Sequence, residues 1–213
     1  MDESPVTIAR EQTPRGEVVL RQRGHTFEIV SNGTFLMDTS SGESERLLAR
    51  LAVAKRARRV LVGGLGVGFT LAEVLAQPSV ESVTVVEIED VVVRWNRGPL
   101  AQVNGGALDD PRAHVVVADF TTWLASTDET FDAICLDVDN GPDWTVVDSN
   151  QALYGVETLR LLKKRLTAGG RLAVWSAAAS GEFAQRLRVV FDDVQTCESP
   201  AAHGPPDVVW LAS

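Results

Sequence analysis

A glycine-rich turn follows the short apolar run 60–62, and its glycines are Gly63, Gly64, Gly66 and Gly68. Glycines let a backbone approach a ligand closely beside the free amides of a helix N-terminus. The spacing departs from the dinucleotide fingerprint, because Phe69 or Leu71 stands at the third glycine position. No Lys-Ser/Thr pair follows, so the turn is not a phosphate-binding P-loop. It predicts another nucleoside-type site; the alternative is a tight turn without a ligand.

Acidic residues end the next two apolar runs. Glu87 ends the run 83–86, and a carboxylate there can accept hydrogen bonds from two ribose hydroxyls. Asp119 ends the run 114–118. Asp119 is either an acceptor for an adenine amino group, with Phe120 packed near the ring, or the N-cap of the helix that follows.

A third acidic segment, 137–144, follows the run 133–136. It carries three carboxylates in seven residues, Asp137, Asp139 and Asp143, and ends in Trp144. Such a loop suits an amine or sulfonium ligand, and carboxylates that repel each other hold raised pKa values and can act as a base. Trp144 can cover a cation with its ring. The alternative is a turn-forming loop without chemistry.

These segments lie at the ends of alternating strands and helices. The four runs above and a fifth at 172–175 are typical of buried parallel strands. Helices are predicted at 69–76, 90–97, 121–126, 152–166 and 183–191, with a helix stop at 167–170, and a closing antiparallel pair at 194–197 and 208–211. This order predicts a doubly wound α/β fold with a mostly parallel seven-stranded sheet.

The segment before residue 59 reads differently. Short strands are predicted at 18–21, 27–30 and 34–37, and Asn32-Gly33 favours a type I′ hairpin between the last two. A helix is predicted over 44–58 with Ser44 as its N-cap. We therefore expect a small N-terminal β-meander in residues 1–43 and a nucleotide-binding domain in 44–213.

Charge and composition exclude several classes of function. Residues 1–58 hold nine basic and eight acidic side chains, whereas residues 59–213 hold 11 and 21. An acidic surface disfavours nucleic acid. No apolar run reaches the length of a membrane span, and residues 1–15 lack the apolar core of a secretory signal. Cys135 and Cys197 lie in apolar runs and are expected to be buried thiols in a cytoplasmic protein. No metal-site spacing occurs.

In this order the motifs resemble the spermidine synthase-like (polyamine aminopropyltransferase) family of the class I S-adenosylmethionine-dependent methyltransferase fold. The resemblance rests on the glycine turn, on Val86-Glu87-Ile88, on Ala118-Asp119 and on the loop from Asp137 to Pro142. It covers about residues 16–213, including the N-terminal meander. The final strand, 208–213, also resembles that of the family.

The resemblance implies a cofactor site formed by the four glycines, Glu87, Ile88, Asp119, Phe120 and Asp137, binding S-adenosylmethionine or decarboxylated S-adenosylmethionine. It implies a small-molecule substrate, a cationic amine for instance, and a homodimer. Asp137, Asp139 and Asn140 are the catalytic candidates. Asn140 stands where the family has the second aspartate of its gate loop, and Ser44-Glu45 replaces a Tyr-His pair. The alternatives are a small-molecule methyltransferase and a non-catalytic nucleoside-binding protein.

Overall fold

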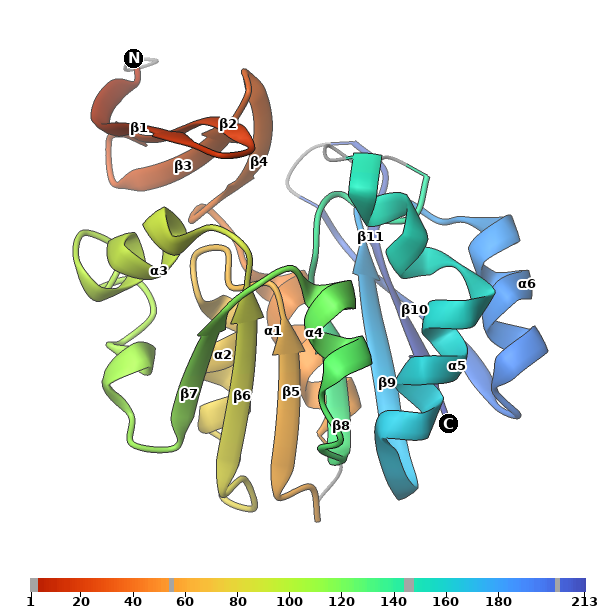
Figure 1. The fold of residues 1–213 in the computed structure, drawn as a ribbon. Coiled ribbons are helices and arrows are strands. Elements are labelled where there is room, and N and C mark those ends of the chain that lie inside the picture. The colour runs from red at the N-terminus through yellow and green to blue at the C-terminus, as the bar shows by residue number, and fades with distance from the viewer. Residues whose placement is uncertain (1–3, 54–55, 144–147, 202–203) are drawn as a thin grey trace.

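The computed structural model describes residues 4–53, 56–143, 148–201 and 204–213, and these form two sheets (Figure 1). A four-stranded antiparallel sheet, the N-terminal sheet, has the order β1-β2-β3-β4, with strands β1 (Val6–Thr13), β2 (Gly16–Arg23), β3 (Thr26–Ser31) and β4 (Thr34–Asp38). A seven-stranded sheet has the order β10-β11-β9-β8-β5-β6-β7. Its strands are β5 (Arg59–Gly63), β6 (Ser82–Glu87), β7 (Ala113–Val117), β8 (Phe131–Leu136), β9 (Leu166–Ser176), β10 (Val194–Ser199) and β11 (Asp207–Ala212).

Strands β5 to β9 of the large sheet are parallel, and β11 and β10 close it as antiparallel strands. This confirms the predicted doubly wound α/β fold and its β-meander. The α-helices are α1 (Glu43–Ala52), α2 (Phe69–Leu75), α3 (Asp90–Arg97), α4 (Phe120–Ser126), α5 (Val156–Arg165) and α6 (Gly181–Val190). Two short 3₁₀ helices, η1 (Ala107–Asp109) and η2 (Asp148–Tyr154), complete the described elements.

Helices cover both faces of the large sheet, and alternate strand residues serve the two cores. Along β5, Val60 and Val62 pack with α1, α2 and α3, whereas Leu61 packs with α4, α5 and α6. This two-residue period on a strand buried on both sides explains why the apolar runs are continuous rather than alternating. None of the described helices has the length and apolar character needed to cross a membrane.

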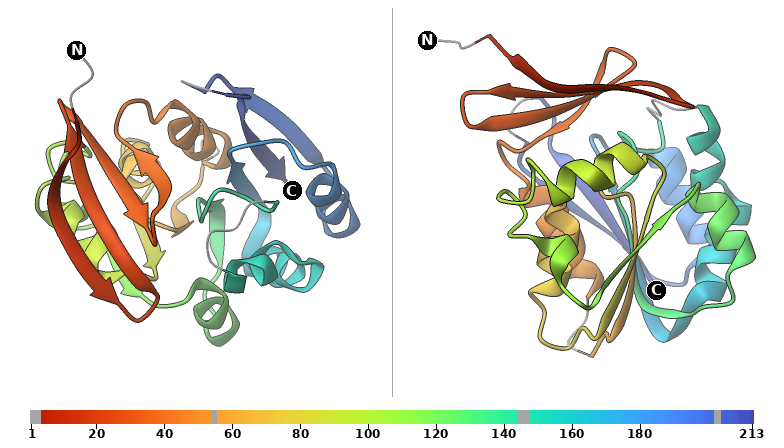
Figure 2. Two further views of the ribbon diagram at one scale, coloured as in Figure 1. Left: turned by 90° about the horizontal axis from the view of Figure 1, so that it is seen from above. Right: turned by 60° about the vertical axis from the view of Figure 1, so that its left-hand side comes forward.

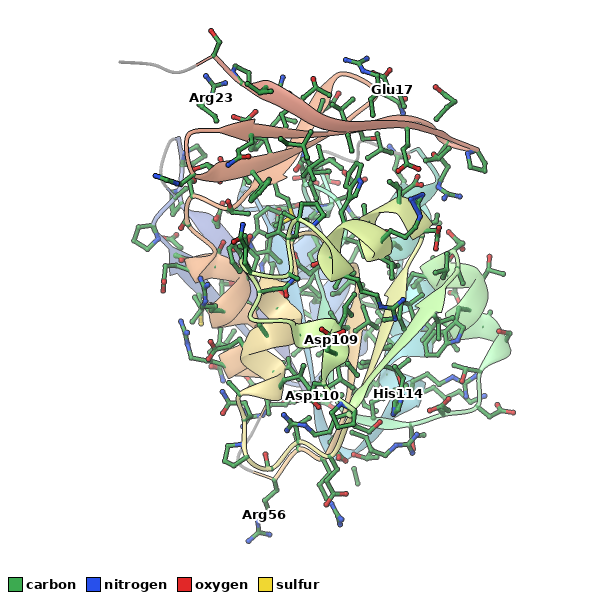
Figure 3. The ribbon with its side chains drawn as sticks, turned by 90° about the vertical axis from the view of Figure 1, so that its left-hand side faces the viewer. Glu17, Arg23, Arg56, Asp109, Asp110 and His114 are labelled. Carbon is green, nitrogen blue, oxygen red and sulfur yellow. The ribbon has the colours of Figure 1, made fainter. Side chains whose placement is uncertain are left out.

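The N-terminal sheet lies over the carboxyl ends of the parallel strands. Glu17 and Arg23 mark this sheet in Figure 3, while Arg56 and His114 lie at the opposite end of the molecule. Seen from above, the N-terminal sheet covers the side of α3 and leaves β10, β11 and α6 uncovered (Figure 2). Leu20 and Ile29 belong to the same core as α1, α2 and α3, so apolar packing fixes this placement.

Several local predictions were confirmed and others need correction. Asn32 and Gly33 have φ values of 50° and 79°, as the type I′ turn requires. Strand β1 was not predicted, because most of its side chains are exposed and no apolar alternation marks it. Helix α1 begins at Glu43 after Gly42, so Ser44 is not its N-cap, and it ends at Ala52.

Two further corrections concern the C-terminal half. Helix α5 begins at Val156 instead of residue 152, since η2 occupies the preceding residues. Helix α5 ends at Arg165, directly before the predicted stop at 167–170, but those residues belong to β9, since Leu166 already pairs with Phe131 of β8. Cys135 is buried as expected, whereas Cys197 on the edge strand β10 is only half-buried.

Candidate active site

A pocket lies between the N-terminal sheet and the carboxyl ends of β5, β6 and β8. Its walls include Ile29, Leu36 and Met37 from the N-terminal sheet and Trp175 from β9. Eight of the predicted site residues line it: Gly64, Gly66, Glu87, Ile88, Asp119, Phe120, Asp137 and Asp139. Gly63, Gly68 and Asn140 are not among its lining residues. The carboxyl ends of parallel strands share one edge, which explains why residues distant in sequence meet here.

The glycine turn fits closely against two neighbouring segments. Gly64 has φ 85°, and a Cβ there would lie 2.0 Å from the carbonyl oxygen of Asp137. Gly66 has φ 53°, and a Cβ there would lie 2.3 Å from Met37 Sδ of the N-terminal sheet. At Gly64 both the positive φ and the fixed backbone oxygen require glycine, whereas at Gly66 the positive φ favours glycine and the flexible Met37 side chain could move aside. The turn therefore lies between the segment that begins at Asp137 and the N-terminal sheet, and it contacts both.

Glu87 is buried at the end of β6, with 7% of its surface exposed. One carboxylate oxygen accepts the backbone N–H of Leu65 at 2.8 Å, and the other accepts that of Glu89 at 2.8 Å. Burial raises the pKa of Glu87, although these backbone donors act in the opposite direction. Each oxygen keeps a second lone pair, so the same carboxylate can also accept ribose hydroxyls from the pocket.

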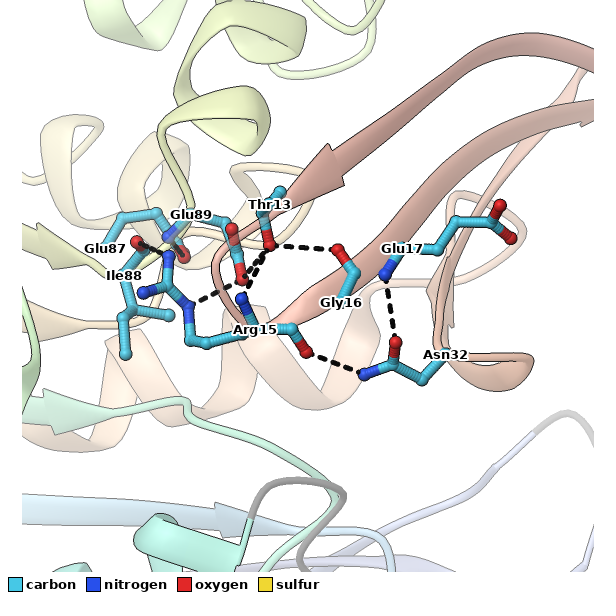
Figure 4. Close-up of polar contacts among 8 residues, drawn as sticks. All are labelled: Thr13, Arg15, Gly16, Glu17, Asn32, Glu87, Ile88 and Glu89. Atoms are coloured by element: carbon cyan, nitrogen blue, oxygen red, sulfur yellow. Dashed lines mark hydrogen bonds and ion pairs between the residues drawn. The ribbon is translucent and has the colours of Figure 1, made fainter.

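Arg15, which sequence analysis missed, reaches into the pocket from the turn between β1 and β2. Its Nε donates to Glu89 Oε1 at 2.7 Å and its Nη2 to the carbonyl of Ile88 at 2.6 Å (Figure 4). Asn32 accepts from the backbone of Glu17 and donates to the carbonyl of Arg15, which braces the turn. Among the lining residues Arg15 is the single cation, and Glu89 neutralises it.

Asp119 is the N-cap of α4, one of its two predicted roles. Its Oδ1 accepts the backbone N–H of Thr122 at 2.8 Å and the hydroxyl of Thr121 at 2.7 Å. Burial acts to raise the pKa of Asp119, but these hydrogen bonds outweigh it and the pKa is lowered. The residue therefore stays ionised at the pocket wall, where Phe120 lies beside it.

The opposite end of the pocket is acidic. Asp137 Oδ2 accepts the hydroxyl of Thr70 at 2.6 Å. Glu45 on α1, 9% exposed, also lines the pocket, and Asp207 at the start of β11 lies near enough to act on both carboxyls. Burial, and then the charge of Glu45, raise the pKa of Asp137 to about 7. Sequence analysis singled out Glu45 only as a departure from the family pattern, and it missed Asp207.

The rest of the acidic loop separates into exposed and buried residues. Asp139 lines the pocket with φ 62°. Asn140 is 6% exposed, and its side-chain nitrogen has no hydrogen-bond partner among the described residues. Asp143 is exposed. Trp144, expected to cover a cation, lies outside the described residues.

Comparison with known proteins agrees with this arrangement. A family model described as "Spermine/spermidine synthase domain" matches residues 45–191. The chain belongs to the spermine/spermidine synthase family. It is 34% identical over 205 residues to polyamine aminopropyltransferase 1 of Hyperthermus butylicus, covering 92% of this chain and 67% of that protein. It is 34% identical over 171 residues to the polyamine aminopropyltransferase of Mycobacterium tuberculosis, covering 78% and 32%. The chain thus spans about a third of the length of that relative.

Solved structures of spermidine synthases share the fold. The chain matches the spermidine synthase of Thermotoga maritima with a TM-score of 0.81 and 19% identity, covering 97% of this chain and 72% of that one. It matches a spermidine synthase in complex with the transition-state analogue AdoDATO with a TM-score of 0.83 and 21% identity, covering 97% and 73%. These structural matches confirm the predicted fold, and the family model and the relatives above confirm the resemblance.

Proposed function

We propose that this chain transfers an aminopropyl group from a decarboxylated S-adenosylmethionine-type donor to a cationic amine. The observation that carries the proposal is the division of the pocket into two ends. One end holds Glu87 and Asp119 beside apolar walls, and suits a nucleoside. The other end gathers Glu45, Asp137 and Asp139, and suits positive charge.

The charge distribution favours the decarboxylated donor over S-adenosylmethionine itself. The full methionine tail carries a carboxylate, which needs a cation or neutral donors. Arg15 is at the nucleoside end and already paired with Glu89, so the acidic end would repel that carboxylate. A tail that ends in an ammonium group alone would be attracted there.

In the mechanism we propose, the pocket holds two cationic reactants in line. Glu87 would accept the ribose hydroxyls, and Asp119 with Phe120 would hold the adenine. The sulfonium would then lie toward Asp137, and the amine would attack the adjacent carbon while the C–S bond breaks onto sulfur. Holding the reactants in place contributes most of the rate. Asp137 or Asp139 would accept the proton that the attacking ammonium group loses.

A second function has support from two observations. Asn140 is buried outside the pocket lining, and Ser44-Glu45 replaces the Tyr-His pair of the family. A protein that keeps the nucleoside end and has changed the amine end would bind a nucleoside without aminopropyl transfer. A small-molecule methyltransferase on the same nucleoside site is the remaining alternative.

Binding and turnover together test the proposal. Thermal unfolding with S-adenosylmethionine, its decarboxylated form and methylthioadenosine ranks the donors, because a ligand at 100 times its Kd adds about 2.7 kcal/mol. The decarboxylated donor should stabilise most, and aminopropyl transfer to putrescine or spermidine should be detectable by mass spectrometry. Methyl transfer, or binding without any product, would support the alternatives instead.

Three further expectations stay proposals. We place the boundary between the N-terminal sheet and the nucleotide-binding domain between residues 43 and 44, at the start of α1 (Glu43–Ala52). We also propose a homodimer and a cytoplasmic location. Size-exclusion chromatography with light scattering tests the first of these two, and cell fractionation the second.

A further inference from the structure

Two carboxyl groups line the acidic end of the pocket beside two hydroxyl groups, and a third carboxyl lies near enough to act on both. Glu45 comes from α1, Asp137 from the end of β8 and Asp207 from the start of β11. Ser44 Oγ donates to Glu45 Oε2 at 2.9 Å. Burial raises the pKa of the Asp207 carboxyl, and the nearby Ser44 hydroxyl acts in the opposite direction. Thr70 Oγ1 lies 2.6 Å from Asp137 Oδ2. Glu45 is buried, whereas Asp137 and Asp207 are half-buried, and each of the two hydroxyls can donate only one hydrogen bond to this group of acids.

This arrangement is costly if all three groups are ionised. A buried carboxylate needs a cation or several donors, and like charges a few ångströms apart oppose each other's ionisation. Arg46, the nearest basic neighbour of Glu45, lies with its guanidinium over the ring of Phe69 at 4.4 Å from the ring centroid. Among the lining residues, Arg15 is held at the other end of the pocket by Glu89. At least one of the three acids is therefore better neutralised by a proton.

We propose that this end of the pocket exchanges a proton for the positive charge of the acceptor. With the pocket empty, Glu45 and Asp207 force Asp137 to hold a proton. An ammonium group that enters between Glu45 and Asp137 supplies the missing positive charge, and Asp137 releases its proton to water. Glu45 is thus a positioning residue that acts through Asp137 and restricts the acceptor to cationic amines. This inference rests on the proposed function.

The proton balance is complete in both steps. On binding, the carboxylic acid of Asp137 and a free ammonium ion give a carboxylate–ammonium pair and one proton in solvent. In the reaction, that carboxylate takes a proton from the ammonium group, and the nitrogen lone pair forms the C–N bond. The C–S bonding pair stays on sulfur, which becomes a neutral thioether.

The groups that face Asp137 come from every element packed around it. Glu45 on α1, Asp207 on β11 and Glu87 on β6 all raise its pKa, after burial, while the hydroxyl of Thr70 on α2 lowers it. Tyr154 of η2, whose phenol donates to the carbonyl of Val138, is buried nearby and its own pKa is raised by burial first and then by Asp139 and Asp137. Removing one acid should therefore change the titration of Asp137 measurably.

The first experiment titrates the free protein. Carboxyl ¹³C NMR, with the Asp137 signal identified from Asp137→Asn, should show that group titrating near neutral pH. Glu45→Gln should lower the midpoint pH by about 1 or more, which is a tenfold higher proton concentration at the midpoint. Glu45→Asp should retain most of the wild-type value. Glu43→Gln, an exposed acid on the same helix, is the matched control and should change nothing. A midpoint at the ordinary aspartate value, or one unmoved by Glu45→Gln, would overturn the inference.

The second experiment measures proton release on binding. Isothermal titration of the methylthioadenosine complex with putrescine, in buffers of different ionisation heat, should show close to one proton released per amine below pH 7. Glu45→Gln should abolish that release. Binding without proton release would overturn the exchange alone. No binding of putrescine would overturn the exchange together with the proposed function, and the titration of the free protein would still report the carboxyl coupling.

Discussion

Replacing Glu87 separates two roles that the structure gives to one carboxylate. Its two oxygens each accept a backbone N–H at 2.8 Å, from Leu65 in the glycine turn and from Glu89 before α3. Hydrogen bonds to a charged group contribute about 1.5–3 kcal/mol each. Water from the adjoining pocket can replace part of this in Glu87→Ala, so we expect a loss of about 2–3 kcal/mol in the free energy of unfolding.

The loss of nucleoside affinity should come in addition. If the ribose hydroxyls bind the remaining lone pairs of Glu87, Glu87→Ala should weaken methylthioadenosine binding at least tenfold, or about 1.4 kcal/mol. Glu87→Gln is a smaller change than Glu87→Ala, because the amide oxygen still accepts one of the two backbone N–H groups. The amide nitrogen is a donor, so the other backbone N–H loses its acceptor. Both variants should be folded at low temperature.

Two assays and a control decide the matter. Urea unfolding gives the stability, and isothermal titration of the folded variants gives the Kd of methylthioadenosine. Glu81, exposed at the other end of β6, is the control, and Glu81→Gln should affect neither quantity by more than about 0.5 kcal/mol. An unaltered Kd in folded Glu87→Ala would refute the assignment of the ribose site, whatever the stability shows.

The other predictions use the glycine turn, the raised acid and the gate loop. Gly64→Ala should lower the free energy of unfolding, measured in urea, by about 3 kcal/mol or more, because the added Cβ would meet a backbone oxygen. Gly105→Ala, at φ 68° with open space around it, should lower it by about 1 kcal/mol. Equal losses in the two variants would contradict this explanation. The pKa of Asp137 is about 7 in the folded protein and 3.8 for an ordinary aspartate. The protonated carboxyl therefore makes its full contribution to the free energy of unfolding below pH 3.8, and this contribution is lost as pH rises through 7. Relative to Asp137→Asn, wild type should therefore lose up to about 4 kcal/mol between pH 4 and 8, while the exposed-site variant Asp109→Asn should follow wild type; parallel curves for wild type and Asp137→Asn would refute it. Asn140→Asp should lower the thermal unfolding midpoint and not raise aminopropyl transfer, since the carboxylate would be buried outside the pocket; a gain in transfer would place residue 140 in the reaction.

Local patterns predicted much of this fold because each segment carries its own signal. Asn32-Gly33 needs two positive φ values wherever it occurs, and the glycine turn follows a strand whose burial on both faces makes it uniformly apolar. Strand β1 has no such signal, because its side chains are largely exposed and only pairing with β2 makes it a strand. Its prediction would have required knowledge of the tertiary partner.

The candidate site divides in the same way. Glu87 and Asp137 were predicted because they stand at strand ends, where parallel strands share an edge. Arg15 and Asp207 lie far from those strand ends in sequence, and nothing local distinguishes them from other surface charges. Only the docking of the N-terminal sheet brings Arg15 to the pocket, and only the antiparallel return of β11 brings Asp207 near Asp137. Asn140 is the opposite case. Its position in the family motif predicted that it belongs to the site, but in the structure it is buried and does not line the pocket.

The docking of the N-terminal sheet also has a consequence for synthesis on the ribosome. Strands β1 to β4 emerge before the helices, and the core that their apolar face, including Leu20 and Ile29, shares with α1, α2 and α3 is complete only when α3 has been made. At about 5–20 residues per second, the stretch from β4 to α3 takes several seconds to emerge. During that time the nascent chain exposes a β-sheet face and a free edge strand, which are the features that chaperones bind and that aggregation uses. Slower translation between β4 and α3 would lengthen this exposure and should lower the yield of folded protein.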